Sequence, residues 1–542
     1  MSLILFLLLF GIHLTHGAVN MYQSKEKVDV FVNKVGPYAN IHETYHFYSL
    51  PICRPEKIIH KSLSLGQVLE GDRVAESTYI IHFGENMARG SLCGDVALDL
   101  ADTERLIRAI EEDYYFEIII DDLRVRNFLG FIEESKQVFP HIHRIFLYTE
   151  SIISFEINEK NQIINIDLKM VHESAVEIEE GKGFSVDFQY SVKWNKTNKT
   201  LSSRPSDGQV LFSTRSMHIH WLSVINSVLL VLLLIMFVAL ILFSAVRRDL
   251  AQYNEGDEQD LLMDNGWKTV AMDVFRKPKH PMLLSAILGV GTQFLIITSI
   301  ILIIASFNIL NLHRHGMLNT ILIFLYALTS FIAGFVSSSK YAQLDGKNWI
   351  VNVHLTMGLF AAPMITVWTI NNSVAWVNNS TQALPWTTVS IVLLIALIIG
   401  YPLAIMGAIL GSSLSKKYEA PCRTRNVPRQ IPALPWYHST PSFCIVAGFL
   451  PFSAISVELY YIFSTIWGRE TYTLFYMLAI VFCIVLWVTA SISIGLTYSQ
   501  LNAEDYHWWW RSIFNGGFVQ LIKLFAIHKR ICLFPCAQQS NQ

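Results

Sequence analysis

Seven long apolar segments in the second half of the chain constrain its fold more than any other feature. They lie near residues 222–246, 282–307, 317–337, 351–370, 387–410, 443–466 and 473–498. Each has about 20 residues or more, which is the length that an α-helix needs to cross a bilayer. Only 15% of all residues are charged, against about 25% in soluble domains. The sequence therefore predicts a multispan α-helical membrane protein with its helix bundle at residues 221–498.

The first apolar run, residues 2–17, is too short to span a bilayer. Thr15 and Gly17 occupy the two positions where signal peptidase selects small residues. We interpret residues 1–17 as a cleaved signal peptide, with an uncleaved anchor as the alternative. Cleavage would place the residues that follow in the lumen.

Residues 18–220 have the pattern of a water-exposed domain. Residues 164–170 and 184–194 alternate between apolar and polar side chains, which is typical of strands with one buried face. One helix is predicted to begin at Asp102 or Thr103 as its N-cap. Several strands and few helices predict a lumenal β-rich, sandwich-like domain.

Lysine and arginine are distributed unevenly between the predicted loops. The loops on one side hold nearly all of them, whereas the loops on the other side hold only Arg314 and Arg469. Because loops rich in lysine and arginine stay in the cytosol, this bias also predicts a lumenal N-terminal domain. Residues 499–542 then form a cytosolic tail. The net charge of −2 gives no indication of a nucleic-acid partner.

Several sequons fall in predicted lumenal regions, and three of them are candidate glycosylation sites. Asn195 and Asn198 each precede Lys-Thr, and Asn379 precedes Ser-Thr. The pattern N-x-S/T accepts N-linked glycans in the lumen, although it is common by chance. We predict glycosylation at these three asparagines.

Cys53 and Cys93 are the only two cysteines in the predicted lumenal domain. Because the lumen permits oxidation, we predict a disulfide between them. In the chain-entropy estimate, a loop of about 40 residues gains about 3–4 kcal/mol from such a bond. Two buried free thiols are the alternative. No cysteine spacing indicates structural zinc, and no motif indicates a cofactor.

The segment from His42 to His46 matches the H-E-x-x-H motif of zinc proteases. That motif binds zinc only on a helix, where both imidazoles share one face. The aromatic residues that follow, and Pro51, favour a strand instead, and no third ligand is evident. We therefore predict neither a metal site nor catalytic residues here.

Motifs between residues 35 and 511 resemble those of the nonaspanins, the transmembrane nine superfamily. They include Val35-Gly36-Pro37-Tyr38, Ile120-Asp121-Asp122-Leu123, Tyr190-Ser191-Val192-Lys193-Trp194, Gly266-Trp267-Lys268, Pro421-Cys422-Arg423, Leu450-Pro451-Phe452-Ser453, Glu458-Leu459-Tyr460-Tyr461 and Glu504-Asp505-Tyr506. The resemblance implies a lumenal β-rich domain and nine membrane helices. It also implies residence in Golgi, endosomal, lysosomal or autophagosomal membranes, and a role in autophagy and in sorting membrane-protein cargo to the surface. No enzymatic activity is implied.

The C-terminal region departs from the family pattern. The family continues with two more helices and a tail that carries a retrieval signal. Here residues 518–527 are apolar but short, and they contain Lys523. We therefore expect about seven spans rather than nine.

Glu458 lies inside the sixth predicted span. A charged side chain in hydrocarbon costs about 2.5–3.5 kcal/mol on insertion scales, so Glu458 should face the bundle or a water-filled cavity. It could be a proton, ion or cargo-contact site, or form a structural hydrogen bond to a tyrosine or to His354. An ion- or solute-coupled transporter or channel using Glu458 is the rival function. Such a protein should contain repeats and several converging polar residues, which the sequence does not display.

The segment Asp257-Glu258-Gln259-Asp260-Leu261-Leu262 has the form of an acidic dileucine sorting signal. It lies in a polar loop, predicted to be cytosolic, where clathrin adaptors could bind Asp257, Leu261 and Leu262. A solvated charge run followed by two leucines is the alternative interpretation.

Overall fold

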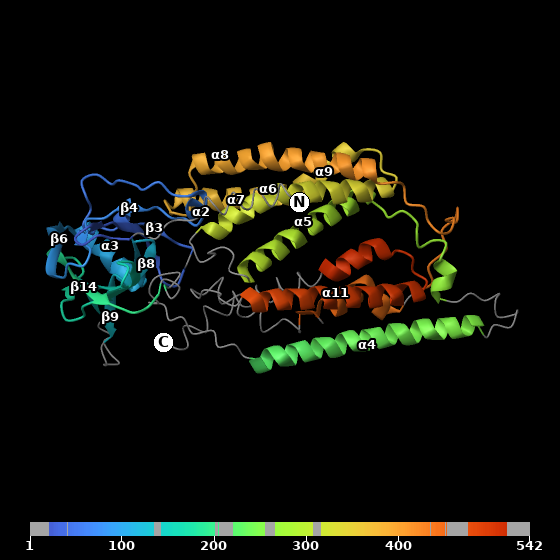
Figure 1. Cartoon of the computed structure of the whole chain (residues 1–542), viewed down its shortest axis with the longest axis horizontal. Helices are drawn as coiled ribbons and strands as arrows, with labels where there is room; N and C mark the ends of the chain where they lie inside the picture. Colours follow the sequence, from blue (N-terminus) through green and yellow to red (C-terminus); the bar gives the residue numbers. More distant parts are fainter. Residues whose placement is uncertain are drawn as a thin grey trace.

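The computed structural model of the chain describes residues 21–40, 42–134, 143–200, 204, 221–254, 266–306, 316–433, 435–449, 451–452 and 475–517. An N-terminal β domain, described here from residue 21 to residue 204, lies at one end of a bundle of long helices (Figure 1). We call the helix ends beside the β domain the near end and the opposite ends the far end. The predicted fold class is confirmed.

The β domain consists mainly of strands and three short helices. The strands are β1 (Lys27–Val28), β2 (Val30–Pro37), β3 (Tyr45–His46), β4 (Ala75–Glu76), β5 (Ile81–His82), β6 (Met87–Leu98), β7 (Tyr114–Ile120), β8 (Leu123–Phe128), β9 (Gly130–Glu134), β10 (His143–Leu147), β11 (Glu150–Ile157), β12 (Ile163–Met170), β13 (Val176–Ile178) and β14 (Phe184–Lys196). The helices are η1 (Phe47–Ser49), α2 (Leu65–Leu69) and α3 (Leu100–Glu111).

These strands pair into four sheets. Their orders are β3-β2-β7-β8 with β4 also on β2, β12-β11-β14-β6, β13-β10-β9, and β1-β5. Strands β11 and β14 run parallel, whereas the other pairs are antiparallel. One apolar core joins the sheets, and Phe155, Ile166 and Leu106 are fully buried in it.

The two alternating segments predicted as strands correspond to β12 and β14. The prediction that Asp102 or Thr103 is the N-cap of helix α3 is wrong. Asp99 caps α3, because its carboxylate accepts a hydrogen bond from the Asp102 amide at 2.7 Å. Thr103 is buried in the first turn, where its hydroxyl donates to the Asp99 carbonyl at 2.8 Å. Helix α3 therefore begins about one turn earlier than the sequence pattern indicates, whereas its buried face begins at Thr103.

Six helical segments among the described residues are long and apolar enough to cross a membrane. They are α4 (Trp221–Asn254), α5 (Pro281–Ser306), α6 (Met317–Gln343), α7 (Trp349–Val377), the continuous run of α8 (Trp386–Ile395), η5 (Ala396–Gly400) and α9 (Tyr401–Leu414), and α11 (Phe475–Asn502). Of the predicted span at 443–466, the described part includes an apolar helix at Thr440–Phe449. The rest of that span is outside the described residues, apart from 451–452.

Helix α6 packs against α5, α7 and α9. Small residues permit this packing, because backbones in a membrane bundle approach closely only where side chains are small. A Cβ atom at Gly334 would lie 2.1 Å from the Ala404 carbonyl oxygen, and one at Gly407 would lie 2.0 Å from that of Phe331. Glycine is therefore required at both positions of the α6–α9 contact.

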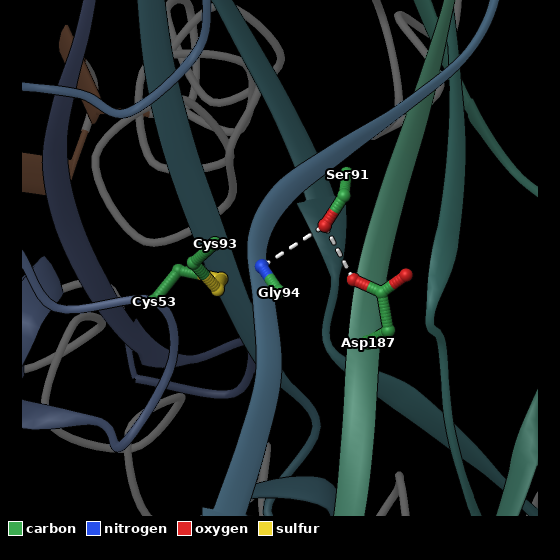
Figure 2. The surroundings of a disulfide bond; sticks show 5 residues. All are labelled: Cys53, Ser91, Cys93, Gly94 and Asp187. Carbon is green, nitrogen blue, oxygen red and sulfur yellow. Dashed lines mark hydrogen bonds between the residues drawn. A yellow bond between two sulfur atoms is a disulfide. The ribbon is translucent and has the colours of Figure 1, made fainter.

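A disulfide joins Cys53 to Cys93 of β6, with their Cα atoms 5.5 Å apart (Figure 2). Beside it, the Ser91 hydroxyl donates to the Asp187 carboxylate at 2.6 Å and accepts from the Gly94 amide at 2.9 Å. The bend in β6 is thus tied both to the loop after η1 and to β14.

We predict that non-reducing peptide mapping of the mature protein will recover Cys53 and Cys93 in one linked peptide pair. Replacing both by serine should lower the free energy of unfolding by about 3–4 kcal/mol, because the unfolded chain gains loop freedom. Recovery of both thiols in alkylated form would contradict the bond.

Candidate functional site at the junction of the β domain and the helices

The β domain contacts two segments at the near end of the bundle. One is the start of α6, and the other is the connection between α7 and α8. Figure 1 places α2 beside these helix ends. We define the junction as Thr44, Glu70 and Arg73 of the β domain with Gly316, Asn319, Ser380, Thr381 and Ala383 of the membrane part.

Thr44 makes the most buried contact of the junction. Its carbonyl oxygen accepts hydrogen bonds from the Thr381 amide and the Ser380 hydroxyl, both at 2.9 Å. The hydroxyls of Thr44 and Thr381 are 2.6 Å apart, and the two residues are 1% and 0% exposed. These buried polar groups are satisfied only while the two parts stay in contact, so separating them without admitting water would be costly.

Two charged side chains extend the junction. Glu70 accepts hydrogen bonds from the Gly316 amide at 3.1 Å and from the Asn319 side-chain amide at 3.3 Å. The Arg73 guanidinium donates to the Ala383 carbonyl oxygen. Both residues therefore bind backbone groups at the near end, and Glu70 also binds the Asn319 side chain.

The backbones themselves meet at Gly66 and Gly316. A Cβ atom on Gly66 would lie 1.8 Å from the Gly316 carbonyl oxygen. Gly316 also has a φ of +76°, a conformation that favours glycine. Ser64 fixes the start of α2 through a capping box with Gln67, so α2 presents its glycine to α6 in a defined position.

A buried ionic network holds the Glu70–Arg73 loop from inside the β domain. Arg124 donates to Asp72 at 2.6 Å and to Glu117 at 3.0 Å. Asn33 donates to Asp72 at 2.9 Å, and its side-chain oxygen accepts from the Arg73 amide at 2.8 Å. Asp72 and Glu117 are 0% exposed.

Basic side chains surround both carboxylates of this network. Burial alone would raise the pKa of Glu117, but the Arg124 and Arg126 guanidinium groups hold it well below its usual range. Glu117 therefore stays ionised at every physiological pH. The network is a fixed structural element rather than a proton donor.

The H-E-x-x-H segment contains the junction residue Thr44. His46 is in β3, and its ring centroid is 6.2 Å from that of His60. The positive charge of Arg73 disfavours protonation of the His46 imidazole. Partial burial, with the Arg73 and His60 charges, lowers the pKa of His46. Among the residues that the structure describes, no group of three or more histidine, cysteine, aspartate or glutamate side chains is arranged to hold a metal ion.

The predicted glycosylation residues are exposed, whereas the predicted sorting and intramembrane residues lie outside the described part of the chain. Asn195 and Asn198 are exposed at the end of β14 and just beyond it. Asn379 is exposed in the turn after α7, directly before the junction residues Ser380 and Thr381. Four predicted residues lie outside the described part of the chain: Asp257, Leu261, Leu262 and Glu458.

A second polar cluster lies inside the bundle and was not predicted. Asn352 of α7 donates to Ser337 of α6 at 2.8 Å and accepts from Ser285 of α5 at 3.3 Å. The Ser337 and Thr356 hydroxyls are 2.7 Å apart. All four are buried and neutral, as in interhelical hydrogen bonding that joins membrane helices. His354 hydrogen-bonds Tyr401 at 2.7 Å.

We predict that Asp72→Asn will destabilise the β domain by about 3–5 kcal/mol, because Glu117 is then the carboxylate that Arg124 and Arg126 must share, so excess positive charge stays buried. The unfolding temperature of the full-length protein in detergent measures this loss of stability. The control is Glu177→Gln, which removes the partner of Arg144 in an exposed ion pair and should leave the unfolding temperature unchanged. Equal unfolding temperatures for both variants and the parent would contradict a structural role for the network.

We also predict that acid weakens the β domain through His46. Because its folded pKa lies below the ordinary value, the unfolded chain binds this proton first, so stability is lost as pH falls through about 6.5. His46→Gln should therefore reduce the drop in unfolding temperature between about pH 7.5 and about pH 5.5. His82→Gln, which removes an imidazole from β5, is the control. An equal drop in His46→Gln and the parent would refute this role.

Comparison with known proteins identifies relatives along most of the chain. Residues 44–528 match the family described as endomembrane protein 70. Transmembrane 9 superfamily member 1 of Bos taurus is 47% identical over 546 residues, which cover 97% of this chain and 89% of that protein. Transmembrane 9 superfamily member 3 of Arabidopsis thaliana is 40% identical over 500 residues, which cover 92% and 84%. No solved structure matches. The chain is a multispan membrane protein that belongs to the endomembrane protein 70, or transmembrane 9, family.

Proposed function

We propose that this protein assists the sorting or surface delivery of other membrane proteins within endomembranes and supports autophagy. Membership of the endomembrane protein 70 family supports an endomembrane role. The observation that carries the proposal is the junction, in which Thr44, Glu70 and Arg73 bind the helix ends directly. A protein built in this way can contact a cargo protein outside and inside the bilayer as one body.

The proposed orientation places the β domain in the lumen and the far end of the helices in the cytosol. In the loops that join the helices, lysines and arginines gather at the far end, as the positive-inside rule requires of cytosolic loops. The sequon residues Asn195, Asn198 and Asn379 all lie on the β-domain side. The proposed compartments are the Golgi, endosomes, lysosomes and autophagosomes.

The proposed sorting signal connects two elements at the far end. Helix α4 ends at Asn254 and η4 (Gly266–Val270) follows, so Asp257, Leu261 and Leu262 lie between them in the sequence. The segment after η4 is anchored, because the indoles of Trp508 and Trp509 donate to the carbonyl oxygens of Val274 and Arg276 at 3.0 and 3.1 Å. A clathrin adaptor would bind the two leucines in an apolar pocket and the acid in a basic one.

A transporter or channel that uses Glu458 is supported less well. The polar side chains that converge among α5, α6 and α7 are neutral and bond one another. A coupled transporter instead needs charged or ion-binding groups that face an open path. The names of the relatives likewise describe membrane proteins rather than catalysts.

We predict that Leu261→Ala combined with Leu262→Ala will shift the protein from endosomes and lysosomes toward the cell surface or the Golgi. The change removes the apolar anchor of the signal and leaves the charges and helices intact. Microscopy and surface labelling measure the distribution of the variant against the parent.

Glycan maturation at Asn195 and Asn198 is the control for folding, because a chain held back by quality control would mimic a sorting defect. An unchanged distribution of the mature variant would show that the loop is only a linker. If no glycan is found on Asn195, Asn198 or Asn379, the proposed lumenal orientation loses its direct support.

A further inference from the structure

The chain between α9 and the helix at Thr440–Phe449 crosses the far end of the bundle as an irregular segment. We call residues 415–433 the strap; in Figure 1 it is part of the orange chain that leaves α9. The strap is held along its length. The Tyr418 amide donates to the Gln343 carbonyl at 3.1 Å, and the Cys422 thiol donates to the Ala271 carbonyl at 3.4 Å.

Two further bonds fix the second half of the strap. The Arg276 guanidinium donates to the Arg425 carbonyl oxygen at 2.8 Å. The Arg429 guanidinium donates to the Glu504 carboxylate at 2.8 Å. The backbone on both sides of Arg423 is therefore anchored, at Cys422 and at Arg425.

Four acidic side chains that the structure describes at the far end pair with basic side chains of the protein. Asp273 pairs with Arg276, Asp345 with Lys277 and Lys417, Glu504 with Arg429, and Asp505 with Arg511. Arg423 and Arg425 are exposed, and within the described ranges no acidic side chain pairs with either of them. With respect to the described residues, their charges are available to a ligand from outside the chain.

The strap lies close to the level of lipid headgroups. It begins directly after α9 ends at Leu414. Trp436, 81% exposed, follows the strap and precedes the next apolar helix, and Trp267 of η4 is 40% exposed. Exposed tryptophans at the ends of membrane helices mark the interface between hydrocarbon and water.

We propose that Arg423 and Arg425 bind the polyanionic headgroup of a phosphorylated inositol lipid in the adjacent leaflet. Each guanidinium group can donate two parallel hydrogen bonds to the oxygens of one phosphate. Two guanidinium groups on an anchored segment therefore fit a headgroup with more than one phosphate. Clusters of basic residues beside membrane helices recognise such lipids. Because these lipids belong to the cytosolic leaflet, the role in cells rests on the proposed orientation.

The test measures binding of a fluorescent short-chain phosphatidylinositol bisphosphate to the full-length protein in detergent. Arg423→Gln with Arg425→Gln should weaken binding roughly 10–30-fold, since each basic residue contributes about fivefold. The matched control is Arg247→Gln with Arg248→Gln. It removes two exposed charges from the far end of α4 and should change affinity by less than about threefold.

Equal weakening by both pairs, or no weakening by the strap pair, would overturn the proposal. So would equally tight binding of phosphatidylserine, which carries a single phosphate. If the glutamine pair fails to fold, Arg423→Lys with Arg425→Lys keeps the charges but removes the guanidinium groups, so it should weaken binding by less than about 10-fold. Unchanged affinity in that variant would also overturn the proposal. Lipid binding in detergent does not depend on the orientation of the protein in a membrane. A negative binding result would therefore overturn the strap proposal without affecting the glycan test of the lumenal orientation.

Discussion

The ion pair between Arg124 and Asp72 is the interaction on which the contact between the two parts of the protein depends. Both groups are removed from water, a loss that is tolerable only because every charge has close partners. Asp72 lies between the two junction residues Glu70 and Arg73, so fixing its carboxylate fixes the backbone of both. The network therefore defines one conformation of the loop more than it adds net stability.

The membrane side of the junction is fixed by different means. No charge is needed there, because α6 is held by close backbone contacts at Gly334 and by neutral hydrogen bonds at Ser337. The first turn of α6 and the residues after α7 are consequently stable partners for Glu70 and Thr44. A rigid loop meets rigid helix ends, so a displacement of the β domain must be passed to α6 and α7 or must break the junction.

Local elements could be predicted from the sequence, whereas the junction could not. Span length and the alternation in β12 and β14 are local patterns. The two strands and six of the seven predicted spans coincide with described elements. The contact of Thr44 with Thr381 joins residues 337 positions apart, and Thr381 was recognised only as part of a sequon. The buried position of Glu117 could have been suspected from the sequence, because Glu117 is the single charged residue within the apolar strand β7.

The contact between Thr44 and Thr381 offers the most direct test of this account. Their hydroxyls are 2.6 Å apart, so Thr44→Cys combined with Thr381→Cys should allow the two new thiols to bond when the protein matures in an oxidising compartment. Non-reducing peptide mapping, with each single variant as control, should recover positions 44 and 381 in one linked pair. Free thiols at both positions in the folded double variant would contradict a docked β domain.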